Sequence, residues 1–81
     1  MFKVNLIHIS EKTLHEGSAK YVLLPGVMGE FEIGIDHAPI AALLCQGKIF
    51  VREDKEDEAK VVQIQQGLMR FDGKELFAVV E

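Results

Sequence analysis

The chain has 81 residues, of which 48% are hydrophobic and 27% charged, and a formal net charge of −4. This length suits one small domain over 1–81, and the composition is that of a globular protein rather than a disordered one. An acidic chain lacks the basic surface that nucleic-acid binding requires, and its single cysteine excludes an internal disulfide.

The longest apolar runs, Tyr21–Pro25 and Ile40–Cys45, are far shorter than the roughly 20 residues that a membrane-spanning helix needs. The opening residues Met1–Val4 contain neither a signal-peptide core nor a transit segment rich in Arg and Ser. We therefore expect a soluble, cytoplasmic protein without direct insertion into a membrane.

Taken in order, most of the chain shows the pattern of short β-strands. Phe2, Val4 and Leu6 alternate with polar neighbours at the start. Three further segments, rich in β-branched and aromatic residues, are 48–52, 61–65 and 76–80. Glycine turns separate the segments, and Asp72-Gly73 is a strong hairpin signal because a type I′ turn needs positive φ at both central residues. Strands that recur at this spacing predict a sandwich or a barrel.

Three glycines, Gly26, Gly29 and Gly34, lie between the first of these segments and the segment 48–52. Their spacing fits neither of the glycine motifs that cradle phosphates, and no helix clearly follows them. We expect them to serve tight turns and a bulge, where positive φ is needed.

The segment 36–47 gives conflicting signals. Asp36 as a cap, Pro39 near the start and Gly47 at the end predict a short helix when local propensity is considered alone. Propensity is a weak guide over so few residues, so the residues by themselves leave helix and strand open.

A block of mixed charge, 52–60, predicts a solvated hairpin connection, with an electrostatic docking patch as the alternative. The last strand candidate carries apolar residues on both of its faces, with Phe77 and Val79 alternating with Leu76, Ala78 and Val80. An isolated two-layer sandwich should leave one face of each sheet polar. The surplus is explained either by packing at the sandwich corners or by a partner that covers an outer face.

Few residues could carry chemistry. The only soft metal ligands, His8, His15, His37 and Cys45, match no zinc spacing, and Cys45 in its apolar run is expected to be a small buried hydrophobe. Glu30 and Glu32 alternate along one strand, which predicts a solvated or partner-facing edge rather than an acid–base pair. We predict no catalytic residue, no metal and no cofactor.

The stretch Gly29-Glu30-Phe31-Glu32-Ile33-Gly34-Ile35-Asp36-His37-Ala38-Pro39 resembles the epsilon subunit of F-type ATP synthases, called delta in mitochondria. The resemblance continues through the aliphatic run after Pro39 to Gly47, and through the strand start at Gly67. Glu32 and Gln66 depart from it, since the family has glycine at both positions.

The resemblance implies an all-β fold, a flattened ten-stranded β-sandwich of two five-stranded sheets, in which Ile40–Cys45 is a strand. It also implies a non-catalytic subunit of the central stalk, a rotary part that joins the gamma subunit to the c-ring and couples proton or other ion transport to ATP synthesis. Such a subunit lies peripherally on the cytoplasmic face of the inner or plasma membrane.

Carried over residue by residue, the resemblance implies a c-ring interface at Glu30, Phe31 and Glu32. It implies a gamma interface at Ser10, at His37 and at Ala42, whose small side chain lets two backbones approach closely. His37 has a competing interpretation as a buried structural histidine bonded to the backbone.

The family commonly continues into a C-terminal helical hairpin, whereas this sequence stops at Glu81. We therefore expect neither conformational inhibition of ATP hydrolysis nor ATP binding. Two alternatives remain: an unrelated β-sandwich interaction module, and a small enzyme or ligand-binding barrel with a pocket lined by His8, His15 or Glu30.

Overall fold

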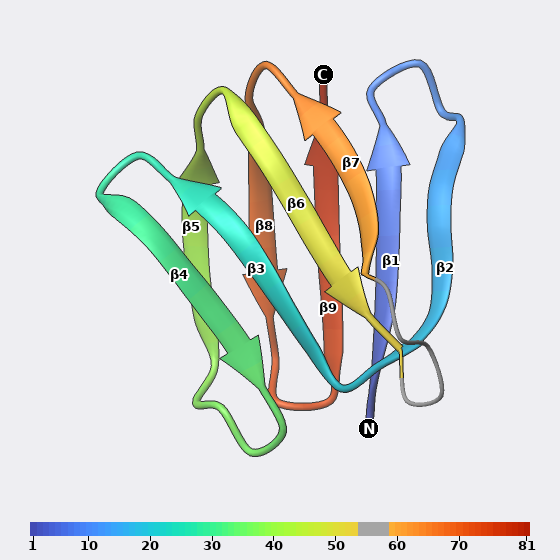
Figure 1. Cartoon of the computed structure of the whole chain (residues 1–81), viewed down its shortest axis with the longest axis vertical. Coiled ribbons are helices and arrows are strands. Elements are labelled where there is room, and N and C mark those ends of the chain that lie inside the picture. Colours follow the sequence, from blue (N-terminus) through green and yellow to red (C-terminus); the bar gives the residue numbers. More distant parts are fainter. Residues whose placement is uncertain (54–58) are drawn as a thin grey trace.

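The computed structural model describes residues 1–53 and 59–81, and in this part the chain is all β (Figure 1). The strands are β1 (Phe2–His8), β2 (Thr13–Ala19), β3 (Tyr21–Gly26), β4 (Gly29–Gly34), β5 (Ile40–Leu44), β6 (Gly47–Arg52), β7 (Lys60–Ile64), β8 (Gly67–Phe71) and β9 (Glu75–Val80). This part of the chain contains no helix that could cross a membrane. Most of the mixed-charge block, 54–58, lies outside the described residues.

The strands form one strongly curved, nearly closed sheet with the order β2-β1-β9-β8-β5-β3-β6-β7, and β4 pairs with the free side of β3. A single pairing, Gly26 with Leu44, joins β3 to β5. The sheet therefore divides into a layer β2-β1-β9-β8-β5 and a layer β4-β3-β6-β7, whose strands cross in front of it in Figure 1. The all-β sandwich is confirmed; the described residues give nine strands in one continuous sheet, where ten strands in two five-stranded sheets were expected.

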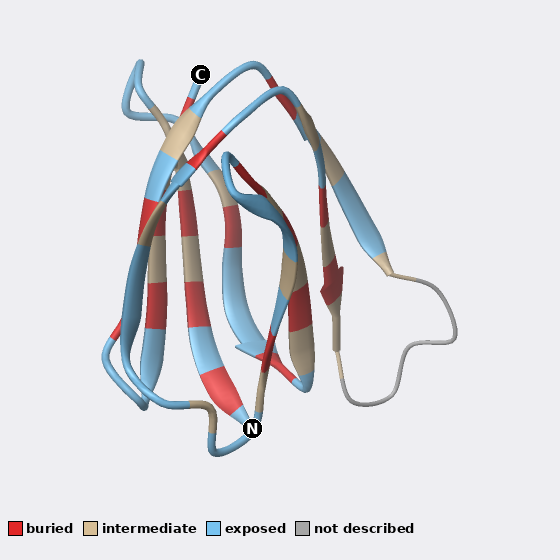
Figure 2. Cartoon of the chain, turned by 90° about the vertical axis from the view of Figure 1, so that its left-hand side faces the viewer, coloured by how far each residue is buried: buried red, intermediate tan, exposed pale blue. Residues whose placement is uncertain are grey.

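The core lies between the two layers, as the buried stripes that face each other in Figure 2 show. In β1, the alternating Phe2, Val4 and Leu6 are all buried, as the sequence pattern predicts. The rings of Phe2 and Phe71 meet edge to face, with centroids 5.3 Å apart. Each such fully buried side chain contributes about 1.5–3 kcal/mol relative to an exposed one.

Residues 40–44 form strand β5 and not a helix. All five residues, Ile40 to Leu44, pair with β8, from Phe71 to Gly67. If 40–44 were a helix, the backbone N–H and C=O groups of β8 that face β5 would have no partner. Buried backbone groups are almost always hydrogen-bonded. Sheet pairing therefore overrides the local helix signal of this segment, and the strand implied by the family resemblance is confirmed.

The glycines act in two different ways. Gly29, at the turn between β3 and β4, has a φ of 124° that favours glycine, whereas Gly26 and Gly34 lie in strands without positive φ. In the hairpin between β8 and β9, Gly73 has a φ of 102° and Lys74 does not have positive φ. The hairpin is confirmed, but its turn is not of type I′, which needs positive φ at both central residues.

Candidate interaction surfaces

The layer β2-β1-β9-β8-β5 has an apolar face that points away from the core. Met69 and Phe71 in β8, and Ala78 and Val80 in β9, are buried. Because side chains alternate along a strand, the residues between them point outward. We call the following set the outer face: Ala41 and Leu43 of β5, Leu68 and Arg70 of β8, and Phe77 and Val79 of β9.

Cross-strand register brings the apolar members of the outer face together. Leu68 lies opposite Leu43 on one side and opposite Val79 on the other. Leu43 and Leu68 are 60% and 56% exposed. A hollow of about 290 Å³ opens between Ala41, Phe77 and their neighbours. The surplus apolar residues of β9 therefore lie on an outer face, and not at the corners of the sandwich.

A single cation interrupts this apolar surface. Arg70 lies opposite Ala41 on β5 and opposite Phe77 on β9. Its guanidinium carbon is 5.9 Å from the centroid of the Phe77 ring, a cation–π distance. No carboxylate in the described part of the chain lies within ion-pair distance of Arg70; its charge acts on Asp72 at longer range.

The hairpin of β3 and β4 forms a second candidate surface. At its tip, Met28 is 97% exposed and Val27 is 55% exposed. Glu30 and Glu32 are both exposed on β4, and Phe31 between them is half-buried and packs against the core. The three residues expected at the c-ring thus lie on one edge strand, β4, and its two carboxylates are on the side that faces solvent.

An apolar hollow of about 500 Å³ lies between this hairpin and β5. Glu30 and Phe31 line one side of it, and Ala42 with Leu43 line the other. The hollow therefore brings residues expected at the c-ring next to one expected at the gamma subunit.

The three residues expected at gamma are spread along the layer. Ser10 follows the end of β1 that lies beside Val80, whereas His37 precedes Ile40, at the opposite end of the strands. Ala42 is half-buried, packs against the core and lies opposite buried Met69. A bulky residue at 42 would therefore disturb core packing as well as any surface contact.

The local contacts of Ser10 and His37 are within the chain. The Ser10 N–H donates to Nδ1 of His8 at 3.1 Å, and the Ser10 hydroxyl lies 2.8 Å from the same nitrogen. The His37 ring bonds the carbonyl of Ala38 at 2.6 Å and meets the ring of Phe71 edge to face at 6.2 Å. The backbone bond agrees with a structural role for His37, although its side chain is only half-buried.

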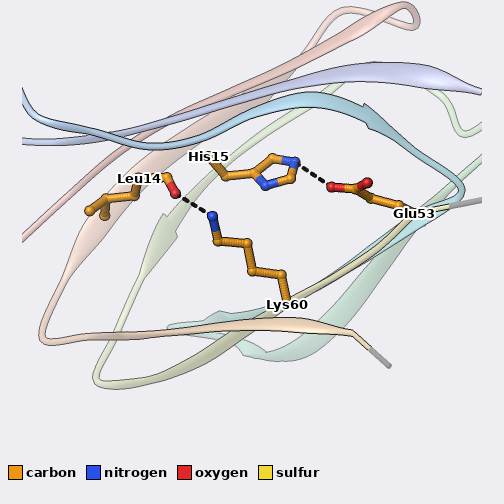
Figure 3. A network of polar contacts seen from close by, with 4 residues as sticks. All are labelled: Leu14, His15, Glu53 and Lys60. Carbon is orange, nitrogen blue, oxygen red and sulfur yellow. Dashed lines mark hydrogen bonds and ion pairs between the residues drawn. The ribbon is translucent and has the colours of Figure 1, made fainter. Parts of the chain in front are cut away.

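The two edges of the curved sheet, β2 and β7, approach each other through side chains (Figure 3). Nζ of Lys60 on β7 donates to the Leu14 carbonyl on β2 at 2.7 Å. His15 is 5% exposed, and its Nε2 lies 3.7 Å from the Glu53 carboxylate without a hydrogen-bond partner. Burial lowers the pKa of His15, and nearby Lys60 lowers it further against the opposing effect of Glu53. The Lys60 bond therefore links the two edges of the sheet through a side chain.

The remaining residues that could bind a metal or react do not form a common site in the described part of the chain. Among the described residues, no group of three or more His, Cys, Asp or Glu could hold a metal ion. Cys45 is exposed, so the expectation that it is a buried hydrophobe is wrong. It lies just beyond the last paired residue of β5, where its N–H donates to the Pro25 carbonyl at 2.8 Å and its side chain leaves the core.

Sequence reasoning did not find Leu43 and Leu68. Neither residue breaks an alternating pattern in its own strand, and only the order β5-β8-β9 places them beside Val79. The available signal was the surplus of apolar residues in 76–80, which indicated a covered face without locating its other members.

Comparisons with known proteins agree with this architecture. The sequence model of the family described as "ATP synthase, Delta/Epsilon chain, beta-sandwich domain" matches residues 1–81. The chain is 36% identical over 69 residues to an ATP synthase epsilon chain of Sulfurimonas denitrificans, covering 84% of this chain and 52% of that protein. It is 37% identical over 49 residues to ATP synthase epsilon chain 2 of Ralstonia nicotianae, covering 60% of this chain and 35% of that protein.

The fold also matches a solved structure. A chain in the cryo-EM structure of the central stalk and c-ring of the Tetrahymena thermophila mitochondrial ATP synthase superimposes with a TM-score of 0.77 at 11% identity. The match covers 98% of this chain and 62% of that chain. The present chain thus spans about half the length of the Sulfurimonas relative. With the family match over 1–81, these findings show that the chain belongs to the β-sandwich domain family of ATP synthase delta and epsilon chains.

Proposed function

We propose that the chain is a non-catalytic subunit in the central stalk of an F-type ATP synthase, where it links the gamma subunit to the c-ring. In this position it couples ion transport through the ring to ATP synthesis, on the cytoplasmic face of the inner or plasma membrane. Its family supports this proposal, as does its likeness in fold to a chain from a central stalk with its c-ring. Transmission of torque needs two docking surfaces on one rigid body, and a β-sandwich provides such a body.

The outer face is the observation that carries the proposal. Large, strongly exposed side chains such as Leu43 and Leu68 lie side by side on adjacent strands. Contiguous exposed apolar surface of this kind marks a protein–protein interface, because covering it removes apolar area from water. We assign the outer face to the gamma subunit, with Ser10 and His37 near its two ends and Ala42 directly beneath it.

The β3–β4 hairpin is the proposed contact with the c-ring. Met28 and Val27 project from its tip, and Glu30 and Glu32 present carboxylates beside them. Exposed carboxylates can accept charge-assisted hydrogen bonds from Arg side chains or backbone N–H groups of a polar loop. Because such rim contacts are worth only about 0.2–1 kcal/mol each, we expect the apolar tip to contribute alongside the charges.

The test is a comparison of two matched substitutions in a binding assay with the gamma subunit. Leu68→Glu places a carboxylate on the outer face, and Val61→Glu places one on β7, where Val61 is 49% exposed. We expect Leu68→Glu to weaken gamma binding by about 30-fold or more, the size of an interface hot spot. Val61→Glu should bind gamma as the unchanged chain does. Equal binding by all three chains would contradict the assignment of the outer face.

A further inference from the structure

Resting on the proposed function, we propose that the surface that docks on the outer face carries a carboxylate that pairs with Arg70 and thereby fixes the register of the complex. The partner of this face is thus not a uniformly apolar surface. It is an apolar protein surface with one acidic side chain. That side chain lies opposite β8, the middle one of the three strands that carry the outer face.

Arg70 is exposed on the free chain and lies beside the apolar row of the outer face. Arginines at the margin of an interface can keep the guanidinium in water while the aliphatic stem is covered. Arg70 has Ala41 on one side and Phe77 on the other. The guanidinium lies over the Phe77 ring, within the apolar surface itself. A partner that covers Leu43, Leu68 and Val79 therefore also covers Arg70.

A covered arginine needs an acceptor. Among the described residues, no side chain lies within ion-pair or hydrogen-bond distance of the Arg70 guanidinium. Its charge acts on the Asp72 carboxylate only at longer range, and that carboxylate accepts hydrogen bonds from the backbone N–H groups of Lys74 and Glu75. Burying a charge without a partner is strongly unfavourable, whereas a carboxylate can accept two parallel N–H bonds from the guanidinium fork. A carboxylate on the docked surface supplies the close acceptor that the described part of the chain does not place beside the guanidinium.

The hollow beside Arg70 indicates a second feature of the partner's surface. The hollow of about 290 Å³ is bordered by Ala41, Leu68, Phe77 and Val79 as well as by Arg70. Its lining is apolar apart from the guanidinium, so it fits an apolar side chain of the partner. An apolar side chain in the hollow with a carboxylate beside it matches the outer face at both points.

The test measures the affinity of the gamma subunit for the unchanged chain and for three variants. Arg70→Met removes the charge but keeps an apolar stem of similar length, and Arg70→Glu reverses the charge. Lys48→Glu is the matched control, because Lys48 is an exposed cation on β6 in the other layer. Thermal unfolding of each variant checks that the fold is kept.

If the partner carries the carboxylate, Arg70→Met should weaken binding about tenfold and Arg70→Glu about 100-fold, since each leaves the acidic group unpaired. Lys48→Glu should remain within about twofold of the unchanged chain. Replacing the acidic residues of gamma by arginine, one at a time, should reveal one replacement that restores tight binding to the Arg70→Glu chain.

Two results would overturn the inference while leaving the proposed function intact. One is tighter or unchanged gamma binding by Arg70→Met in an assay where Leu68→Glu abolishes it, because the covering surface would then be wholly apolar. The other is the absence of any restoring replacement in gamma. Failure of the unchanged chain to bind gamma would instead overturn the proposed function itself, and this inference with it.

Discussion

At Gly26, the backbone of β3 passes so close to the turn into β4 that a side chain does not fit. A Cβ atom there would lie 2.8 Å from the Gly29 carbonyl oxygen and 2.8 Å from Cε1 of Phe31. At Gly34, at the far end of β4, a Cβ would have nothing within 4 Å. The absence of a side chain at Gly26 therefore lets Phe31 pack against the core beside the hairpin.

We predict opposite effects of alanine at these two glycines. Gly26→Ala should lower the free energy of unfolding by about 1–3 kcal/mol, as overpacking does. Gly34→Ala should be neutral or raise it by about 0.4–1 kcal/mol, because alanine restricts the unfolded chain. Urea unfolding of both variants measures the difference. Equal stability of the two variants would mean that β3 and β4 are not packed as described.

The buried ring of His15 predicts a dependence of stability on pH. Burial first, and Lys60 second, hold the pKa of His15 in the folded chain below its ordinary value near 6.5. The unfolded chain therefore binds this proton more readily. The contribution of His15 to stability is complete above about pH 6.5 and is lost as the pH falls through the lowered pKa.

The substitution His15→Gln removes the titrating group. We expect the unchanged chain to lose stability between pH 7 and pH 5 more steeply than the His15→Gln variant, so that the difference in their free energies of unfolding shrinks with acidification. Denaturant unfolding at a series of pH values measures this difference. Parallel curves for the two chains would show that His15 takes up its proton equally in the folded and unfolded states.

At the scale of single residues, the sequence predicted which side chains of a strand are buried. It did not predict exposure at the end of a strand or the type of a turn. The buried triplet Phe2, Val4 and Leu6 follows directly from period-two spacing. Exposure of Cys45 does not, because it depends on where the pairing of β5 with β8 stops. In the same way, Asp72-Gly73 predicted a hairpin, but the choice of Gly73 and Lys74 as central residues is set by the pairing of Phe71 with Leu76.

Strand β2 lies at one edge of the sheet, opposite the edge formed by β7. Within residues 1–53 and 59–81 it pairs with β1 alone, and a bulge interrupts this pairing between Leu6 and Ile7. The bond from Lys60 to the Leu14 carbonyl is the contact that ties it to the opposite edge, β7. Edge strands need such protection because their unpaired backbone groups are open to other chains.

We predict that Lys60→Met loosens β2 in particular. Loss of one such hydrogen bond should cost about 0.5–1.5 kcal/mol and should speed hydrogen exchange of the β2 amides, while those of β8 and β9 remain protected. Lys48→Met, on an exposed lysine of β6, is the control. Uniform exchange changes across all strands, or none in β2, would contradict the role given to the Lys60 contact.

The elements also differ in how far they could be predicted. Strands β1, β6, β7 and β9 carry β-branched and aromatic residues in the expected pattern. Strand β5 was resolved by the family resemblance, since its residues favour a helix and only the ladder with β8 makes them a strand. Strand β2 was not recognised, because Thr13–Ala19 holds Gly17, three polar residues and a buried histidine instead of an apolar alternation.

At the scale of the whole molecule, the outer face exists because of strand order and not because of any one segment. The chain places β8 between β5 and β9, two strands that are distant in sequence, and so collects Leu43, Leu68 and Val79 in one row. Apolar residues on both faces of 76–80 indicated that some face is covered. The identity of its neighbours could not follow from spacing, because spacing does not determine which strands pair.

In the proposed arrangement, a single rigid body docks on two partners through two surfaces: the outer face on gamma, and the β3–β4 hairpin on the c-ring. Three exposed positions distinguish these surfaces: Leu68 on the outer face, Met28 at the hairpin tip and Val61 on β7. All three side chains are large and apolar, and at least 49% of each is exposed, so a photoreactive residue can replace any of them without entering the core.

The most direct test is photo-cross-linking from these three positions, one at a time, in the assembled synthase. We expect the group at Leu68 to form adducts with the gamma subunit, the group at Met28 to form adducts with the c subunit, and the group at Val61 to form adducts with neither. Adducts with gamma from Val61 but not from Leu68, or an absence of c-subunit adducts from Met28, would contradict the proposed arrangement.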